Sequence, residues 1–362
     1  MPRVRKEAQA RRGRDSGEVT VDLSPWGLVV GHATDVEGAT GLTVVRAADG
    51  AMQAGAAVLG RATGTRELLT VSPEHLVDRI DAILLTGGSA YGLDAAAGVM
   101  RWMEEHGRGF PVAGGVVPIV PAAVIFDLAP LGRFDARPTS AMAYEACERA
   151  RATRIEEGSA GAGTGATVGK AAGRAWAMKG GFGIAAAHGV GASVAAMAVV
   201  NALGDVRDAD GSIIAGARNA DGSFADSARL AAAGALAPRI GDVAAPIDTA
   251  AQNTTLAVVA VDAPLTRLEL SALAKAAGAA LYRRITPTGT SLDGDVIFAV
   301  CPHDPRIRSH VQPAPPHVEA LAVQALESAI ERAVRMARGR DGIPGLADAT
   351  PPRSKDRAPR RS

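Results

Sequence analysis

Residues 247–265 read IDTAAQNTTLAVVAVDAPL, and this stretch decides how the rest of the chain is interpreted. A small polar lead-in ends at Asn253, and a run of strand-forming residues extends from Leu256 to Val261. The run is short and rich in valine, which favours a buried strand over a helix. Thr254 therefore stands at the start of a predicted buried strand. An N-terminal nucleophile would occupy this position if the chain were cut between Asn253 and Thr254.

The composition is that of an α/β protein with a sizeable core. The chain has 362 residues, of which 47% are hydrophobic and only 3% aromatic, and its formal net charge is +1. Few aromatic side chains and no excess of positive charge argue against nucleic acid as a partner. The two cysteines, Cys147 and Cys301, have no metal-ligand spacing, so we expect neither a disulfide nor a metal site.

The basic residues cluster at the two ends of the chain. This pattern predicts disordered basic tails over residues 1–17 and 346–362. No apolar segment of secretory type follows the first basic cluster, and no apolar run reaches membrane-spanning length. The sequence thus predicts a cytoplasmic protein that does not use a membrane as a partner.

The expected strands and helices alternate irregularly, without a repeating βαβ unit. That order favours a layered α/β sandwich over a doubly wound sheet. Residues 81–86 predict a buried strand that runs through a glycine turn into a helix, and residues 55–69 predict a loop. Further strands are expected at 182–186 and 191–201, and helices at 93–106, 139–151, 265–281 and 318–338.

Three glycine motifs come close to known functional patterns and fail. Residues 161–166 resemble a dinucleotide fingerprint, but the preceding residues are polar and no acidic residue follows at the right distance. Gly169-Lys170 lacks the glycine and the hydroxyl residue of a phosphate-binding loop. Tyr91 replaces the second glycine of a hydrolase nucleophile elbow around Ser89. No nucleotide cofactor is expected, and these stretches are interpreted as close-approach glycine loops.

Chemistry alone leaves the role of Thr254 open. A β-branched residue readily opens a strand, so a structural threonine is one interpretation and a nucleophile is the other. Asn253-Thr254-Thr255 also matches a glycosylation sequon, but the expected buried strand and the missing secretory segment speak against modification.

From Val29 to about Pro302 the chain resembles the DmpA-type aminopeptidases, the β-aminopeptidyl hydrolase family of self-cleaving serine or threonine peptidases. The resemblance rests on motifs that occur in the same order. They are VGHATD at 30–35, GTRE at 64–67, DAILLTGGSAYGL at 81–93, GAGTGATVGK at 161–170, KGGFG at 179–183, VVNALGDV at 199–206, NTTLAVVAVDAPL at 253–265 and LDGDVIF at 292–298.

The resemblance implies a layered αββα sandwich of the DmpA and ornithine acetyltransferase type, with one catalytic domain over residues 18–345. It implies that the precursor cleaves itself between Asn253 and Thr254 into α and β chains that stay together as a homotetramer of cleaved units. The implied substrate is a small peptide or amide, and no metal or cofactor is needed.

The resemblance also assigns roles to single residues. Thr254 is the implied nucleophile, and its free α-amine, with a reference pKa of about 7.7–8.0, serves as its base after cleavage. Asn201 matches the family's oxyanion donor, and Asp295 matches the residue that orients the amine. Asp293 stands where the best-known members have serine.

The glycine loops at Gly88-Ser89 and Gly163-Thr164 are expected to shape the substrate pocket. Two alternatives to a hydrolase remain open at this point. One is an acyltransferase of the ornithine acetyltransferase type, which passes the acyl group to an amine instead of water. The other is a non-catalytic small-molecule-binding protein with the same fold.

Overall fold

The strand expected from the opening stretch is β15 (Thr254–Val261), and all of its residues are buried. Its side chains alternate between two cores. Leu256 and Val258 pack between the two large sheets, whereas Ala257 and Val259 pack beneath helices. Burial on both faces explains why the sequence of this strand is apolar without interruption.

The computed structural model describes residues 21–129, 131–236, 253–303 and 316–348. The tail predicted at 1–17, and that at 346–362 apart from its first three residues, lie outside these ranges. β15 is the central strand of a five-stranded sheet with the order β11-β12-β15-β17-β3, and it runs antiparallel to β12 and parallel to β17. The other strands of this sheet are β11 (Gly181–Gly189), β12 (Ala192–Asn201), β17 (Val296–Pro302) and β3 (Met52–Val58).

A second five-stranded sheet packs face to face against the first. Its order is β1-β2-β5-β8-β4, and it places β1 at one edge. Its strands are β1 (Leu28–Asp35), β2 (Thr40–Ala47), β5 (Ala82–Thr86), β8 (Ala122–Val124) and β4 (Thr65–Arg66).

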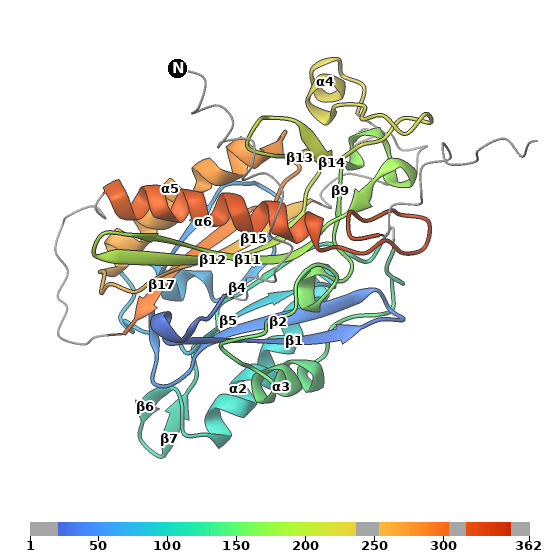
Figure 1. Cartoon of the computed structure of the whole chain (residues 1–362). Coiled ribbons are helices and arrows are strands. Elements are labelled where there is room, and N and C mark those ends of the chain that lie inside the picture. Colours follow the sequence, from blue (N-terminus) through green and yellow to red (C-terminus); the bar gives the residue numbers. More distant parts are fainter. Residues whose placement is uncertain (1–20, 130, 237–252, 304–315, 349–362) are drawn as a thin grey trace, which may run out of the picture.

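Helices cover the outer face of each sheet (Figure 1). α5 (Arg267–Arg284) and α6 (Pro316–Arg335) lie over the sheet that contains β15. α2 (Ala96–Glu105) and α3 (Ser140–Glu148) lie under the other sheet. The expected αββα sandwich is confirmed.

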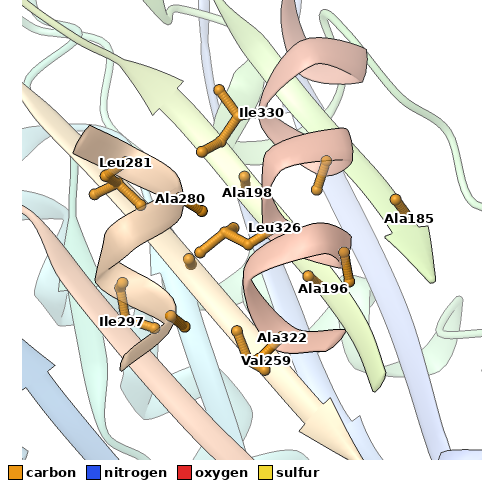
Figure 2. Close-up of a cluster of buried hydrophobic side chains, with 14 of the residues drawn as sticks. Ala185, Ala196, Ala198, Val259, Ala280, Leu281, Ile297, Ala322, Leu326 and Ile330 are labelled. Carbon is orange, nitrogen blue, oxygen red and sulfur yellow. The ribbon is translucent and has the colours of Figure 1, made fainter. Parts of the chain in front are cut away.

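Small side chains let α6 lie close to the sheet. Figure 2 shows alanines of β12 and of α6, among them Ala196, Ala198 and Ala322, filling this layer around Leu326 and Ile330. Gly183 of β11 faces the same helix, and a Cβ atom added there would lie 2.1 Å from the carbonyl oxygen of Ala329. This close packing accounts for a large core with few aromatic residues.

The structure corrects two local predictions. The loop expected at 55–69 is wrong at residues 55–58, which belong to β3, and at residues 65–66, which form the short strand β4. The helix expected at 93–106 begins earlier as a 3-10 helix at Ser89–Ala95 and becomes α2 only afterwards. The remaining elements are β6 (Phe110–Val112), β7 (Gly115–Val117), β9 (Thr167–Val168), β10 (Met178–Lys179), β13 (Asp205–Arg207), β14 (Ile213–Ala215), β16 (Ile285–Thr286), α4 (Ser227–Ala232) and short 3-10 helices at Ser24–Trp26, Leu68–Val71, Gly161–Gly163, Lys170–Ala172 and Arg174–Trp176.

Candidate active site

Thr254 and Asn201 lie directly opposite each other on neighbouring strands. Thr254 is the first residue of β15, Asn201 is the last residue of β12, and the antiparallel register pairs them. Directly paired residues point to the same face of a sheet. Here that face is the one turned toward the second sheet, because Leu256 and Val199 share it. Both residues are buried, with 5% of the surface of Thr254 and 0% of that of Asn201 exposed.

Two hydrogen-bond donors meet at the carbonyl oxygen of Asn253. The hydroxyl of Thr254 donates to it at 2.6 Å, and the main-chain N–H of Gly294 donates to it at 2.8 Å. The Gly294 bond exists because Asn253 pairs with Asp293 in a parallel bridge just before β15 and β17 begin. The nucleophile predicted from the sequence therefore contacts the peptide group that it is expected to cut.

Only glycine fits between the two aspartates. A Cβ atom on Gly294 would lie 2.8 Å from the Thr254 hydroxyl oxygen and 2.6 Å from the carbonyl oxygen of Ala62. The Asp-Gly-Asp motif thus brings a main-chain donor close to the Asn253 carbonyl, with a carboxylate on each side.

Asp295 is buried beside β15. Its carboxylate accepts a hydrogen bond from the N–H of Thr255 at 2.6 Å and others from Thr288 and Gly289. Burial raises the pKa of Asp295 to about 7, and the neighbouring carboxylate of Asp293 adds to this shift. A carboxyl group that titrates near neutral pH suits acid–base chemistry.

Asp293 is held by its own turn. One of its carboxylate oxygens accepts hydrogen bonds from the N–H and the hydroxyl of Thr290, at 2.8 and 2.7 Å. Burial raises its pKa, while the hydrogen bonds from Thr290 and the positive charge of Lys170 oppose that shift. Among the described residues, no group of three or more His, Cys, Asp or Glu side chains is arranged to hold a metal ion.

Lys170, which the sequence suggested only as part of a failed phosphate-binding motif, contacts the candidate site. Its ammonium group is buried and donates to the side-chain oxygen of Asn201 at 2.9 Å and to the main-chain oxygens of Asn201 and Thr167. Burial lowers the pKa of Lys170 to about 7, with Asp293 opposing. One sequence signal could have indicated a role for Lys170. It stands in a stretch of small residues, 161–173, that contains no acidic residue.

These contacts fix the orientation of the Asn201 amide. Its oxygen accepts from Lys170 and from the N–H of Thr167, so its NH2 group must face the other way. That group donates to the carbonyl oxygen of Phe126 at 3.2 Å.

The predicted glycine turn at Gly88-Ser89 joins the site indirectly. The N–H of Gly88 donates to the carboxylate of Asp127 at 2.6 Å, and Asp127 follows Phe126, the partner of Asn201. Gly88 and Ser89 both have left-handed backbone conformations, and the N–H of Ser89 donates to Ile125. Burial raises the pKa of Asp127 to about 6.

Gly163 and Thr164 form a buried support behind Asn201. A Cβ atom on Gly163 would lie 2.3 Å from the main-chain nitrogen of Phe182, and the carbonyl of Thr164 accepts from the buried ammonium of Lys179 at 2.7 Å. Thr167, the partner of the Asn201 amide, follows in the same loop. The structure thus gathers Thr254, Asn201 and the two aspartates, with these glycine loops around them.

A family model matches almost the whole described chain. Residues 24–347 match the model described as Peptidase family S58. The chain belongs to peptidase family S58. It is therefore a peptide hydrolase by family, as expected from the ordered motifs.

Relatives of similar length agree with this assignment. An uncharacterised aminopeptidase of Mycobacterium tuberculosis is 40% identical over 328 residues, which cover 86% of this chain and 90% of the relative. A 6-aminohexanoate-oligomer endohydrolase of a Kocuria species is 32% identical over 297 residues, which cover 79% of this chain and 76% of the relative.

Solved structures share the fold. The L-aminopeptidase D-Ala-esterase/amidase of Ochrobactrum anthropi, described as a variant of the N-terminal-nucleophile hydrolase fold, superposes with a TM-score of 0.63 at 18% identity and 91% coverage of both chains. A β-aminopeptidase of a Burkholderia species gives a TM-score of 0.59 at 20% identity, covering 86% of this chain and 85% of that one. None of the helices described here is long and apolar enough to span a membrane.

Proposed function

We propose that this chain is a self-processing N-terminal-nucleophile hydrolase that cuts itself between Asn253 and Thr254 and then releases N-terminal residues from small peptides or amides. One observation carries the proposal. The Thr254 hydroxyl and the Gly294 N–H both hydrogen-bond to the carbonyl oxygen of Asn253. The first group is the proposed nucleophile, and the second is placed to stabilise the negative charge that its attack creates.

Self-cleavage proceeds in two steps. The Thr254 oxygen bonds to the carbonyl carbon of Asn253, and the peptide C–N bond then breaks as the proton lost by the hydroxyl is transferred to the Thr254 nitrogen. This exchange converts the amide into an ester. Water hydrolyses the ester, which leaves a carboxylate on Asn253 and a free α-amine on Thr254.

Substrate hydrolysis repeats the same acyl transfer. The α-amine accepts the proton of the Thr254 hydroxyl while the oxygen attacks the substrate carbonyl carbon. The scissile C–N bond breaks, and the leaving amine departs with that proton. Water then hydrolyses the acyl-Thr254 ester, which releases the N-terminal residue as a carboxylic acid and restores the hydroxyl. Asp295 and Asp293 form an acidic pair beside Thr254, and the negative charge that this pair carries favours a substrate amine. Lys170 acts as a positioning residue, because it fixes which end of the Asn201 amide faces the site.

The substrate class is proposed more broadly than α-peptides. The relative named for 6-aminohexanoate oligomers indicates that linear amides with a distant amine belong in the test set. α-Aminoacyl amides, β-aminoacyl amides and 6-aminohexanoate oligomers therefore form the panel. Release of free amine in water is the expected outcome. Transfer of the acyl group to an added amino acid in its place would favour the acyltransferase alternative, and cleavage of no member would overturn the proposed activity.

Three earlier expectations stay predictions. They are the single catalytic domain over 18–345, the homotetramer of cleaved αβ units and the cytoplasmic location. Light scattering on the purified protein tests the second directly. We expect a mass equal to four αβ units, and a mass equal to a single αβ unit would contradict the homotetramer.

A further inference from the structure

A cavity of about 390 Å³ opens at the edge of the sheet formed by β1, away from the residues proposed for catalysis. One wall is β1 itself and the other is the segment that follows α3. The polar residues that line it are His32, Thr34, Arg149, Arg151, Arg154 and Glu156.

The lining carries a positive charge. Three of its side chains are guanidinium groups and one is a carboxylate, that of the exposed Glu156. Arg149 pairs with Glu145 on the surface of α3. Within the described part of the chain, neither Arg151 nor Arg154 has an ion-pair partner. Arg151 and Arg154 are thus exposed residues without an ion-pair partner in that part of the chain, and both line the same cavity.

The backbone presents these arginines rigidly. Arg151 forms two main-chain hydrogen bonds with Val30 of β1, at 2.9 and 3.0 Å. Arg154 has a left-handed conformation with φ of 55°, which residues other than glycine seldom adopt. Such strain persists where the surrounding structure enforces it, and it is enriched at ligand sites.

His32 adds a neutral group to the floor of the cavity. Its Nδ1 lies 2.9 Å from the hydroxyl oxygen of Thr43, which also accepts a hydrogen bond from the N–H of Ala162. A Thr43 hydroxyl that donates to Nδ1 places the ring proton on Nε2. Burial lowers the pKa of His32 to about 4, with the Glu156 main chain opposing, so the ring is neutral near pH 7.

We propose that this cavity binds the phosphate group of a small anion, either inorganic phosphate or a phosphate monoester. Guanidinium groups bind phosphate through paired charge-assisted hydrogen bonds, and several of them on one cavity wall match a dianion. The hydroxyl of Thr34 lies on the same lining. The inference does not depend on the proposed peptidase chemistry.

Calorimetric titration of the full-length protein tests the site, with sodium chloride holding the ionic strength constant. One arm uses inorganic phosphate and a second uses glycerol phosphate as the monoester. We expect saturable binding in at least one arm, and the stronger arm identifies the source. Absence of saturable binding in both arms would overturn the proposal.

Two double variants of equal charge change separate a site from general attraction. Arg151→Gln with Arg154→Asn removes both unpaired arginines, and asparagine tolerates the left-handed conformation. We expect affinity to fall by about tenfold for each lost charged contact. Arg101→Gln with Arg133→Gln, two exposed arginines that do not line the cavity, should leave affinity unchanged. An equal loss in both double variants would contradict a specific site.

A folding check keeps the test decisive. The thermal transition of each variant is measured without phosphate. If the Arg151 and Arg154 double variant does not fold, Arg149→Gln replaces it, because the Arg149 side chain is largely exposed and its partner Glu145 lies on the surface. Unchanged phosphate affinity in a folded cavity variant would refute the assignment.

Discussion

Replacing Gly294 with alanine should slow self-cleavage while leaving the chain folded. The added Cβ atom would lie 2.8 Å from the Thr254 hydroxyl oxygen and 2.6 Å from the carbonyl oxygen of Ala62, so the turn must shift. That shift moves the Gly294 N–H away from the carbonyl oxygen of Asn253, to which it donates at 2.8 Å. The variant thus removes a donor and disturbs the nucleophile at the same place.

The size of the effect follows from known losses of this kind. Removing one donor to a developing oxyanion slows acyl transfer by roughly 10²- to 10³-fold, or about 2.7–4 kcal/mol. Overpacking a buried position costs about 1–3 kcal/mol of stability. A typical domain is stable by about 5–15 kcal/mol, so the variant should still fold.

Denaturing gels of freshly translated chain, sampled over time, measure the conversion of the 36.7 kDa precursor into two fragments. Gly115→Ala serves as a neutral control, because a Cβ atom there meets nothing within 4 Å. Gly183→Ala serves as a packing control, because it creates a clash with α6 outside the Asp-Gly-Asp turn. We expect both controls to cleave at the normal rate. A Gly294→Ala chain that is folded and cleaves as fast as these controls would refute the role of this N–H.

Three further predictions concern the groups around the nucleophile. Lys170→Met should slow self-cleavage by about tenfold or more, because the Asn201 amide loses the donor that orients it. Gel time courses measure this rate. An unchanged rate would argue against a role of Lys170 in positioning Asn201. In the uncleaved Thr254→Ala chain, the contribution of Asp295 to the free energy of unfolding should fall as the pH rises from about 4 to 7. Burial raises the pKa of Asp295 from 3.8 to about 7, so over this range the folded chain keeps a proton that the unfolded chain releases. Urea unfolding should show a weaker dependence of this free energy on pH in the Asp295→Asn variant. An identical pH dependence would contradict a raised pKa of Asp295. Hydrolysis by the cleaved enzyme should rise with pH through the α-amine pKa of about 7.7–8.0, and a rate that is flat from pH 6 to 9 would exclude the amine as base.

The strand β15 was predictable from the sequence because its apolar pattern is local. A short valine-rich run after a polar segment predicts a buried strand, and β15 begins at Thr254 as expected. The layered αββα arrangement also followed from the order of elements and from the family resemblance. The segment at β3 was mistaken for a loop, because its glycine and alanine residues carry little strand signal. It becomes a strand by pairing with β17, which lies far away in the chain.

The assembly of the site was not predictable from spacing alone. Asn201, Thr254 and Asp295 meet because β12, β15 and β17 are neighbours in the sheet, and only the resemblance had joined them. Lys170 was considered only as part of a phosphate-binding loop, because its contact with the Asn201 amide depends on burial that no local sequence pattern records. Gly294 was given no role from the sequence, and its N–H acquires one from the parallel bridge between Asn253 and Asp293.

Mass analysis and N-terminal sequencing of the purified protein test directly whether the chain is cut between Asn253 and Thr254. We expect two fragments, the second beginning at Thr254, and a Thr254→Ala chain that stays intact and inactive. Thr255→Ala, which removes the neighbouring hydroxyl, should still be cut at the same bond. Three results would contradict self-cleavage by Thr254. They are an intact wild-type chain, a second fragment that begins at another residue, and processing of the Thr254→Ala chain.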